Sequence, residues 1–303
     1  MIRLALVAIS ITFFAGLSCT KNSGAKTEIV QNTVAHAAVP PCEPTSKYVE
    51  FENVSFSYDP CVFGDVIGKH IEEFRLPRPV NEYKPDGVAP EHIRFEFDKG
   101  PQYWEPFVEI YPIKRFPEMY AVDKRMMKDI AQEIHDLKSV IKNPTLRFHG
   151  EIPYLPYVDA HQEMQAKVKP GTFGGGTGVY FVTYIDTETI LINNDHLRYI
   201  FEGISPDGKN YVLGEIPISL PYLDDVTRNV DRTSLEGFTY DDLMEMLRTD
   251  EKDRKKPKYL SLAQRYQTYL SAVTSHIEKM NPDEFNPALS KLEQLIASLK
   301  INN

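Results

Sequence analysis

Residues 92–98 read HIRFEFD, and this alternation decides the fold class. Successive residues of an extended chain point to opposite faces, so Ile93, Phe95 and Phe97 share one face and charged side chains occupy the other. One apolar and one polar face are typical of an antiparallel sheet with one side in water. The pattern predicts such a strand, and FVEIY at 107–111 is its expected partner.

Further strands are expected on both sides of this pair. Residues 48–58 are dense in β-branched and aromatic side chains, with a break at Asn53. After residue 145 the chain again favours strands, and PDGK at 206–209 is typical of a tight turn between two of them. The expected strands here are 179–185, 197–201 and 210–216.

Helices are expected in two regions. Apolar residues recur every three or four positions between Pro117 and Asn143, which predicts an amphipathic helix. The apolar stripe consists of Val122, Met126, Ile130, Ile134, Leu137 and Ile141. Beyond Gly237 the expected helices are 238–247, 259–280 and 282–299, with the charged run EKDRKKPK at 251–258 as a solvated loop. The order of elements predicts an α+β fold, a mostly antiparallel sheet flanked by helices with a helical C-terminus.

The first residues, MIRLALVAISITFFAGLSCT, predict export. The uncharged run from Leu4 to Leu17 has the length of a signal-peptide core and is too short to span a bilayer. Its end, GLSC at 16–19, resembles the bacterial lipobox, although the leucine stands one place late. We therefore expect a signal peptide at 1–18 and acylation of Cys19, by palmitate or a similar chain. A plain secretory signal and a retained membrane anchor are the alternatives.

The rest of the chain divides into a tether and a body. Residues 19–41 show no apolar period and end in Pro40-Pro41, so we expect a lipid-anchored tether. Residues 42–303 are expected to form a single α+β domain, in which 237–303 could pack as a helical sub-lobe.

The chain has three cysteines. An odd number in an exported protein needs an explanation, and lipidation of Cys19 would supply it. In an oxidising compartment we expect Cys42 and Cys61 to form a disulfide, with two buried free thiols as the alternative.

Composition and missing motifs exclude several functions. The chain carries 34 Lys and Arg against 43 Asp and Glu, a net charge of −9, which argues against nucleic acid as a partner. There is no Gly-x-Ser-x-Gly elbow. Among eight histidines, His161-Gln162-Glu163 comes nearest to a ligand pair, whereas zinc needs three or four ligands. No catalytic residue, metal ligand or cofactor is therefore expected.

The glycine-rich segment GTFGGGTG at 171–178 precedes an expected strand, so it lacks the helix N-terminus of a phosphate-binding loop. A hairpin loop is expected, or a mobile loop that contacts a partner. Tyrosines on nearby strands could stack on a sugar or peptide, with core packing as the alternative. The candidate binding surface comprises Phe173, Gly174, Gly175, Gly176, Tyr180, Tyr184, Tyr199 and Tyr211.

Carboxylates offer one further route to chemistry. Paired acids could hydrolyse a substrate, although solvated turns are the simpler interpretation. The candidates are Asp186, Glu188, Asp195, Asp224 and Asp225.

IPYLP at 152–156, GTGV at 176–179 and YIFEGISPDGKNY at 199–211 resemble a group of secreted bacterial proteins, lipoproteins among them, to which no function is assigned. Phe51 to Pro60 and FNPAL at 285–289 are similar to the start and finish of that group. A fainter similarity is to the PsbP/Mog1-type sandwich, an antiparallel sheet flanked by helices. The resemblance implies a fold and carries no site residues.

These observations together favour a lipid-anchored extracytoplasmic envelope protein that binds a protein or glycan partner without catalysis. A carboxylate-based hydrolase and a carrier of a small apolar ligand are the alternatives.

Overall fold

The computed structural model describes residues 45–75, 88–99, 105–121, 123–158, 160–225 and 237–302. Residues 42–303 form one compact unit. The expectations for residues 1–41, including the signal peptide, the tether and Cys19, lie outside the described residues, as does Cys42.

The predicted α+β fold is confirmed by a seven-stranded sheet whose neighbouring strands all run antiparallel. HIRFEFD supplies β6, and the expected partner at 107–111 pairs with it as β7. In spatial order the strands are β3 (Val66–Ile71), β6 (His92–Phe97), β7 (Phe107–Pro112), β11 (Asn210–Pro217), β10 (Leu197–Ile204), β9 (Gly176–Asp186) and β8 (His161–Phe173).

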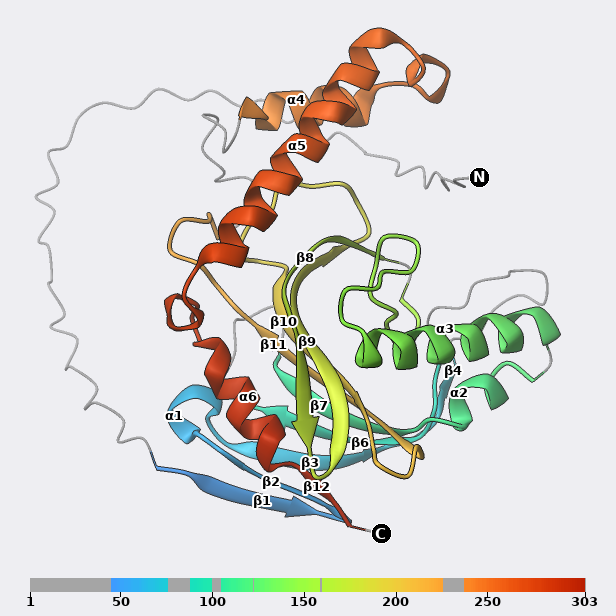
Figure 1. The fold of residues 1–303 in the computed structure, drawn as a ribbon, viewed down its shortest axis with the longest axis vertical. Coiled ribbons are helices and arrows are strands. Elements are labelled where there is room, and N and C mark those ends of the chain that lie inside the picture. The colour runs from blue at the N-terminus through green and yellow to red at the C-terminus, as the bar shows by residue number, and fades with distance from the viewer. Residues whose placement is uncertain are drawn as a thin grey trace, which may run out of the picture. The chain divides into compact units, whose positions relative to one another are not determined.

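One face of this sheet packs on the C-terminal helices (Figure 1). Phe95 of β6 and Phe201 of β10 are fully buried there, together with apolar residues of all three helices. A three-stranded sheet adds to the same layer, and its last strand brings the C-terminal residues beside β2. The elements are α4 (Tyr240–Arg248), α5 (Pro257–Lys279), α6 (Leu289–Ser298), α1 (Pro60–Phe63), β1 (Lys47–Phe51), β2 (Val54–Tyr58) and β12 (Lys300–Ile301).

The opposite face is covered by α2 (Arg115–Glu118) and α3 (Lys124–Lys142). The predicted stripe buries Met126, Ile130, Ile134 and Leu137 against this face. The prediction that one side of β6 faces water is therefore wrong in part. His92 is buried, and the side chains of Arg94 and Glu96 are only a quarter exposed. A two-stranded sheet of β4 (Phe74–Arg75) and β5 (Val88–Ala89) completes the described strands.

Three helix boundaries differ from the expectation. The helix expected from Pro117 is two helices, because the Asp123 side chain caps a new N-terminus by accepting the N–H groups of Arg125 and Met126. The helix expected at 282–299 starts only at Leu289, after a short 3-10 turn at Pro282–Glu284. The helix expected at 259–280 begins two residues earlier, as α5 at Pro257, because proline suits the first turn of a helix.

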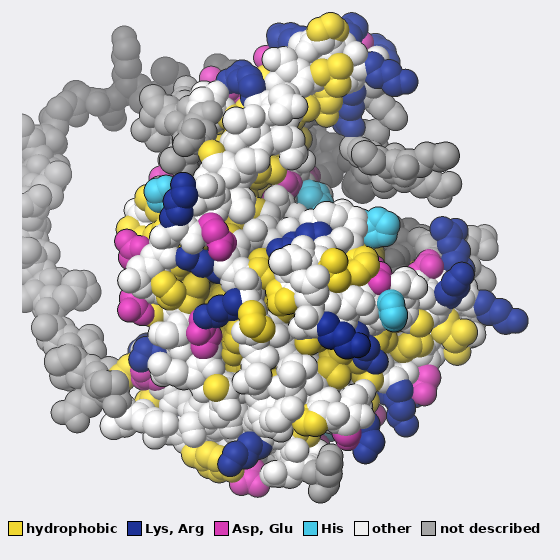
Figure 2. Space-filling view, in the orientation of Figure 1, with side chains coloured by type: hydrophobic (Ala, Val, Ile, Leu, Met, Phe, Trp, Pro, Cys, Tyr) yellow, Lys and Arg dark blue, Asp and Glu magenta, His cyan; other side chains and the backbone are white. Residues whose placement is uncertain are grey.

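The charged run at 251–258 is largely in water, as expected. Lys252 and Lys258 expose 75% and 77% of their side chains, and Glu251–Asp253 form a single 3-10 turn. Figure 2 shows basic side chains gathered at the end of the molecule where α4 meets α5. None of the helices in the described part of the chain is both long and apolar enough to cross a bilayer.

Candidate functional site

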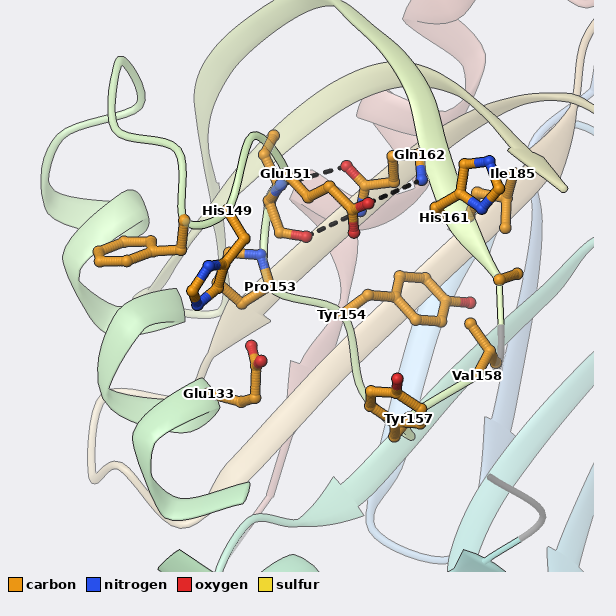
Figure 3. A pocket seen from close by; sticks show the side chains of 13 residues that line it. Glu133, His149, Glu151, Pro153, Tyr154, Tyr157, Val158, His161, Gln162 and Ile185 are labelled. Carbon is orange, nitrogen blue, oxygen red and sulfur yellow. Dashed lines mark hydrogen bonds between the residues drawn. The ribbon is translucent and has the colours of Figure 1, made fainter. Parts of the chain in front are cut away.

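A pocket of about 310 Å3 opens between α3 and the start of β8, under the loop that connects them (Figure 3). Loop residues 148–160 supply most of its wall, α3 supplies Glu133 and β9 supplies Ile185. Its volume lies at the lower end of the range for small-molecule sites. The lining residues are Glu133, Phe148, His149, Glu151, Ile152, Pro153, Tyr154, Tyr157, Val158, Ala160, His161, Gln162 and Ile185.

A tight turn sets the upper wall. The N–H of Phe148 donates to the Glu151 carbonyl at 2.8 Å, and the N–H of Glu151 returns a bond to the Phe148 carbonyl at 3.0 Å. The two residues between them, His149 and Gly150, have φ of 54° and 90°. Positive φ at both central positions is the geometry of a type I′ turn, which glycine adopts freely. The turn thereby places His149 and Glu151 side by side at the pocket.

Gln162 fixes this loop to β8. Its side-chain amide accepts from the N–H of Ile152 at 3.1 Å and donates to the Ile152 carbonyl at 2.7 Å. Its backbone N–H donates to Oε1 of Glu151 at 3.3 Å. Gln162 is buried, so these bonds hold both its amide and the Glu151 carboxylate in place. Gln162 is therefore a positioning residue of the pocket.

Two carboxyl groups of the pocket have raised pKa values. Burial raises the pKa of Glu133, and the nearby negative charges of Asp136 and Glu151 add to the shift. Burial is also the main cause of the raised pKa of Glu151. Among the described residues, neither the Glu133 carboxylate nor the His149 imidazole has a hydrogen-bond partner, although the charge of His149 lowers the pKa of Glu133 in part. Both are therefore available to a ligand.

His161 closes the pocket on the β8 side. Its Nε2 lies 2.9 Å from Oε1 of Glu163, and this hydrogen bond raises the pKa of the imidazole. The two residues stand two positions apart in β8, so their side chains lie on one face of the strand. The Tyr266 hydroxyl of α5 donates to the other Glu163 oxygen at 3.0 Å, so the pair is also tied to the helical layer.

A buried ionic network supports the pocket from below. The Tyr154 hydroxyl donates to Oε2 of Glu215 at 3.0 Å, while Oε1 of the same carboxylate lies 3.0 Å from Nε of Arg198. Glu215 and Arg198 expose 8% and 3% of their side chains. Burial, followed by the charge of Glu215, raises the pKa of Tyr154 well above its ordinary value. Tyr154 therefore stays neutral, with its ring on the pocket.

The candidate glycine segment is a hairpin between β8 and β9, not a cradle for phosphate. Phe173 pairs with Gly176, and the turn residues Gly174 and Gly175 have φ of 42° and 86°. A Cβ on Gly174 would lie 2.8 Å from the Leu299 carbonyl oxygen, so the hairpin tip packs closely on the C-terminal residues. Phe173 itself is buried.

The four candidate tyrosines do not form the expected open surface. Each exposes at most 4% of its area. Tyr180, Tyr184 and Tyr199 face the C-terminal helices, and Tyr211 lies on the opposite face of the sheet. Tyr180 and Tyr199 stack at 5.6 Å between ring centroids, as core packing rather than as a binding platform. The correction follows from helices that cover both faces of the sheet.

None of the candidate acids lines the pocket, although Asp186 pairs with the lining residue His161 across β8 and β9. Asp186 and Asp195 flank His196, with the Asp186 carboxylate 2.8 Å from Nδ1, and this contact raises the pKa of the imidazole. Asp224 and Asp225 lie beside Asn194. Glu188 is in the turn after β9. Among the described residues, none of these five acids therefore shares the pocket with Glu133.

Cys61 lies in α1 and is not a free thiol. Because its expected partner Cys42 is outside the described residues, the disulfide between them stays a prediction. Within the described ranges, one group of side chains is close enough together to hold a metal ion. It consists of His70, Glu72 and Glu91, all exposed.

The pocket residues were largely missed by sequence reasoning. Glu133 sits on the polar side of an amphipathic helix, where acids are common. The His-Gly pair at 149–150 was the available signal, since glycine is favoured in the second position of a type I′ turn.

No family model, curated protein or solved structure matches this chain. The resemblance to secreted bacterial proteins and to the PsbP/Mog1-type sandwich therefore stays a prediction.

Proposed function

We propose that this protein is a lipid-anchored extracytoplasmic binding protein that holds a small polar solute in the pocket between α3 and β8, without transforming it. The pocket carries the proposal. It combines aromatic walls with side chains that donate and accept hydrogen bonds, which is the usual make-up of a site for a small polar molecule. A monosaccharide or a small amine would match its volume.

Binding is favoured over hydrolysis by the direction of the two pKa shifts. Paired-acid catalysis needs one ionised and one protonated carboxyl group, so the environments of the pair should push their pKa values apart. Glu133 and Glu151 are both shifted upward, and each by burial first. A carboxylate-based hydrolase is therefore the second candidate, since two acids do share this pocket. The carrier of an apolar ligand has less support, because polar groups line the pocket.

Blocking the pocket should abolish solute binding. Val158 lines the pocket and is 39% exposed, so a tryptophan there can cover the opening without entering the core. We expect one or more members of a panel of sugars, amino acids, amines and carboxylic acids to raise the Tm of the natural chain by about 5–10 °C near 100 Kd. Val158→Trp should lose this shift in differential scanning fluorimetry.

Leu146→Trp is the matched control. Leu146 lies in the same connecting segment and is 38% exposed, but it does not line the pocket. It should keep the full shift. A panel that stabilises neither the natural chain nor Leu146→Trp contradicts the binding function.

The membrane attachment is tested separately at Cys19. We expect Cys19→Ala to move most of the protein from the membrane fraction to the soluble fraction, because two acyl chains anchor stably whereas none does. The mass of the natural protein should equal residues 19–303 plus acyl groups. An unmodified mass, or a Cys19→Ala protein that stays in the membrane fraction, rejects the lipid anchor and leaves the pocket hypothesis intact.

A further inference from the structure

The charges around the pocket are unbalanced. Two of its lining residues, Glu133 and Glu151, are carboxylates, and none is Lys or Arg. His161 already pairs with Glu163, whose carboxylate balances any positive charge on the imidazole. His149 is the other histidine in the lining.

Two arginines near the pocket bond to other groups. Arg147 precedes the pocket turn, but its guanidinium donates to the carbonyls of Pro144 and Leu146 at 2.8 and 2.6 Å. Arg198, below the pocket, pairs with Glu215. No Arg or Lys of the described residues is among the groups that shift the pKa values of Glu133 and Glu151.

We propose that the solute held in this pocket is a small organic cation, an ammonium group on a short hydroxylated or apolar body. This inference rests on the proposed binding function and adds the charge of the ligand. The ammonium group would lie between Glu133 and Glu151, and the body would contact Phe148, Tyr154 and Tyr157.

Both parts of the pocket suit such a ligand. Aromatic rings attract cations through their negative faces, and this attraction strengthens where water is excluded. Figure 3 shows the rings of Tyr154 and Tyr157 on one side of the pocket and the Glu133 and Glu151 carboxyl groups on other sides of it. Oε1 of Glu151 is held by Gln162, so the carboxylate is already oriented before the ligand arrives.

The electrostatics point the same way. Burial makes both carboxylates costly to ionise and is the first cause of their raised pKa values, which nearby histidines lower only in part. A cation entering the pocket would lower both pKa values and recover that cost. An anion would add to the repulsion, so the same pocket should exclude carboxylates and phosphates.

Choline and its uncharged isostere, in which tert-butyl replaces trimethylammonium, test the charge directly. The two probes have nearly the same shape, so a difference in affinity reports the positive charge. By isothermal titration calorimetry near neutral pH, we expect choline to bind the full chain at least about tenfold more tightly than the isostere.

Charge-removing variants locate the effect. Glu133→Gln and Glu151→Gln should each weaken choline binding by about tenfold and leave binding of the isostere unchanged. Asp129→Asn is the matched control. It removes one charge from α3 a turn before Glu133, at a side chain that is 55% exposed and outside the pocket, and should change choline affinity less than about twofold.

The outcomes separate the two proposals. Equal binding of choline and its isostere overturns the cation, as does unchanged choline affinity in the Glu133→Gln, Glu151→Gln double variant. A neutral probe such as glucose could instead bind the natural chain more tightly than choline and fail to bind Val158→Trp. That result would overturn the proposal of a cationic ligand and support the binding function. If neither these probes nor the wider panel bind, both proposals fail. Circular dichroism of each variant checks that it is folded.

Discussion

Replacing Arg198 by Met is expected to lower the free energy of unfolding by about 3–5 kcal/mol. The guanidinium is 3% exposed and lies 3.0 Å from Oε1 of Glu215, itself a buried side chain. Arg198 also donates to the carbonyls of Asp195 and Leu197 at 3.1 and 3.2 Å. Methionine fills much of the volume but supplies neither the charge nor the donors. The variant therefore leaves Glu215 buried and uncompensated, and urea denaturation measures the loss.

Two further variants make this prediction specific. Lys47→Met removes an ion pair of similar length, 2.9 Å to Asp65, in which the side chains are 51% and 74% exposed, so its urea midpoint should match the natural chain. Arg198→Met combined with Glu215→Leu should recover much of the lost stability, because no unpaired charge remains. An Arg198→Met protein with the natural midpoint would show that the network below the pocket contributes little to stability.

Glu202→Gln is expected to stabilise the protein at alkaline pH. Glu202 of β10 is fully buried on the α3 face, and its Oε2 has no hydrogen-bond partner among the described residues. The Tyr211 hydroxyl donates to Oε1 at 3.0 Å. Burial raises the pKa of Glu202 well above its ordinary value, the Tyr211 hydrogen bond lowers it in part, and the charge of Glu133 raises it further. At a pH between the unfolded and the folded pKa, the folded state therefore holds a proton that the unfolded state has released.

The direction of the pH dependence follows from this proton. Above the ordinary carboxyl pKa of 4.5, the unfolded chain binds fewer protons at this site than the folded chain, so stability falls as pH rises toward the folded pKa. The limiting slope is about 1.4 kcal/mol per pH unit. The glutamine side chain does not titrate, so the stability of Glu202→Gln relative to the natural chain should increase as the pH rises from about 5 toward the raised pKa of the folded state.

Urea denaturation across that pH range measures the difference. Glu188→Gln, at an exposed position after β9, is the control and should follow the natural chain at every pH. A constant difference between Glu202→Gln and the natural chain would mean that Glu202 has the same proton affinity in the folded and unfolded states, contrary to its burial.

Local patterns predicted the central sheet and the main helix well. HIRFEFD alternates with a period of two, and its apolar residues Phe95 and Phe97 are buried as that period requires. The Met126-to-Leu137 stripe likewise faces the sheet. The strand β3, at VIGKHI, was missed because Gly68 and His70 weaken its pattern, while its pairing with β6 comes from tertiary contacts.

The second covered face of the sheet could not be predicted from one strand. Alternating charge on β6 suggests water, yet Arg94 pairs with Glu109 of β7 and packs over Phe107 at 4.4 Å from the ring centroid. Because Arg94 has these partners, the polar face of β6 can be buried without leaving its charge unpaired. The tyrosines were misplaced for the same reason, since an apolar layer on each side leaves neither face open.

The pocket depends on groups brought together from separate segments. Glu133, Glu151 and His161 come from a helix, a loop and a strand, and their spacing in sequence carries no signature. Only the His149-Gly150 turn is encoded locally.

The pairing of β12 with β2 also affects how the chain can fold. The Asn53 side chain donates to the Asn302 carbonyl at 3.0 Å, across 249 positions of sequence, and Ser298 bonds to Ser57 across 241. The β1–β2 hairpin leaves the ribosome long before its third strand is translated. Because such distant pairing closes a large loop, it is slow. Until then the β2 edge of the hairpin lacks its strand partner, and an unpaired strand edge is a site where aggregation can start.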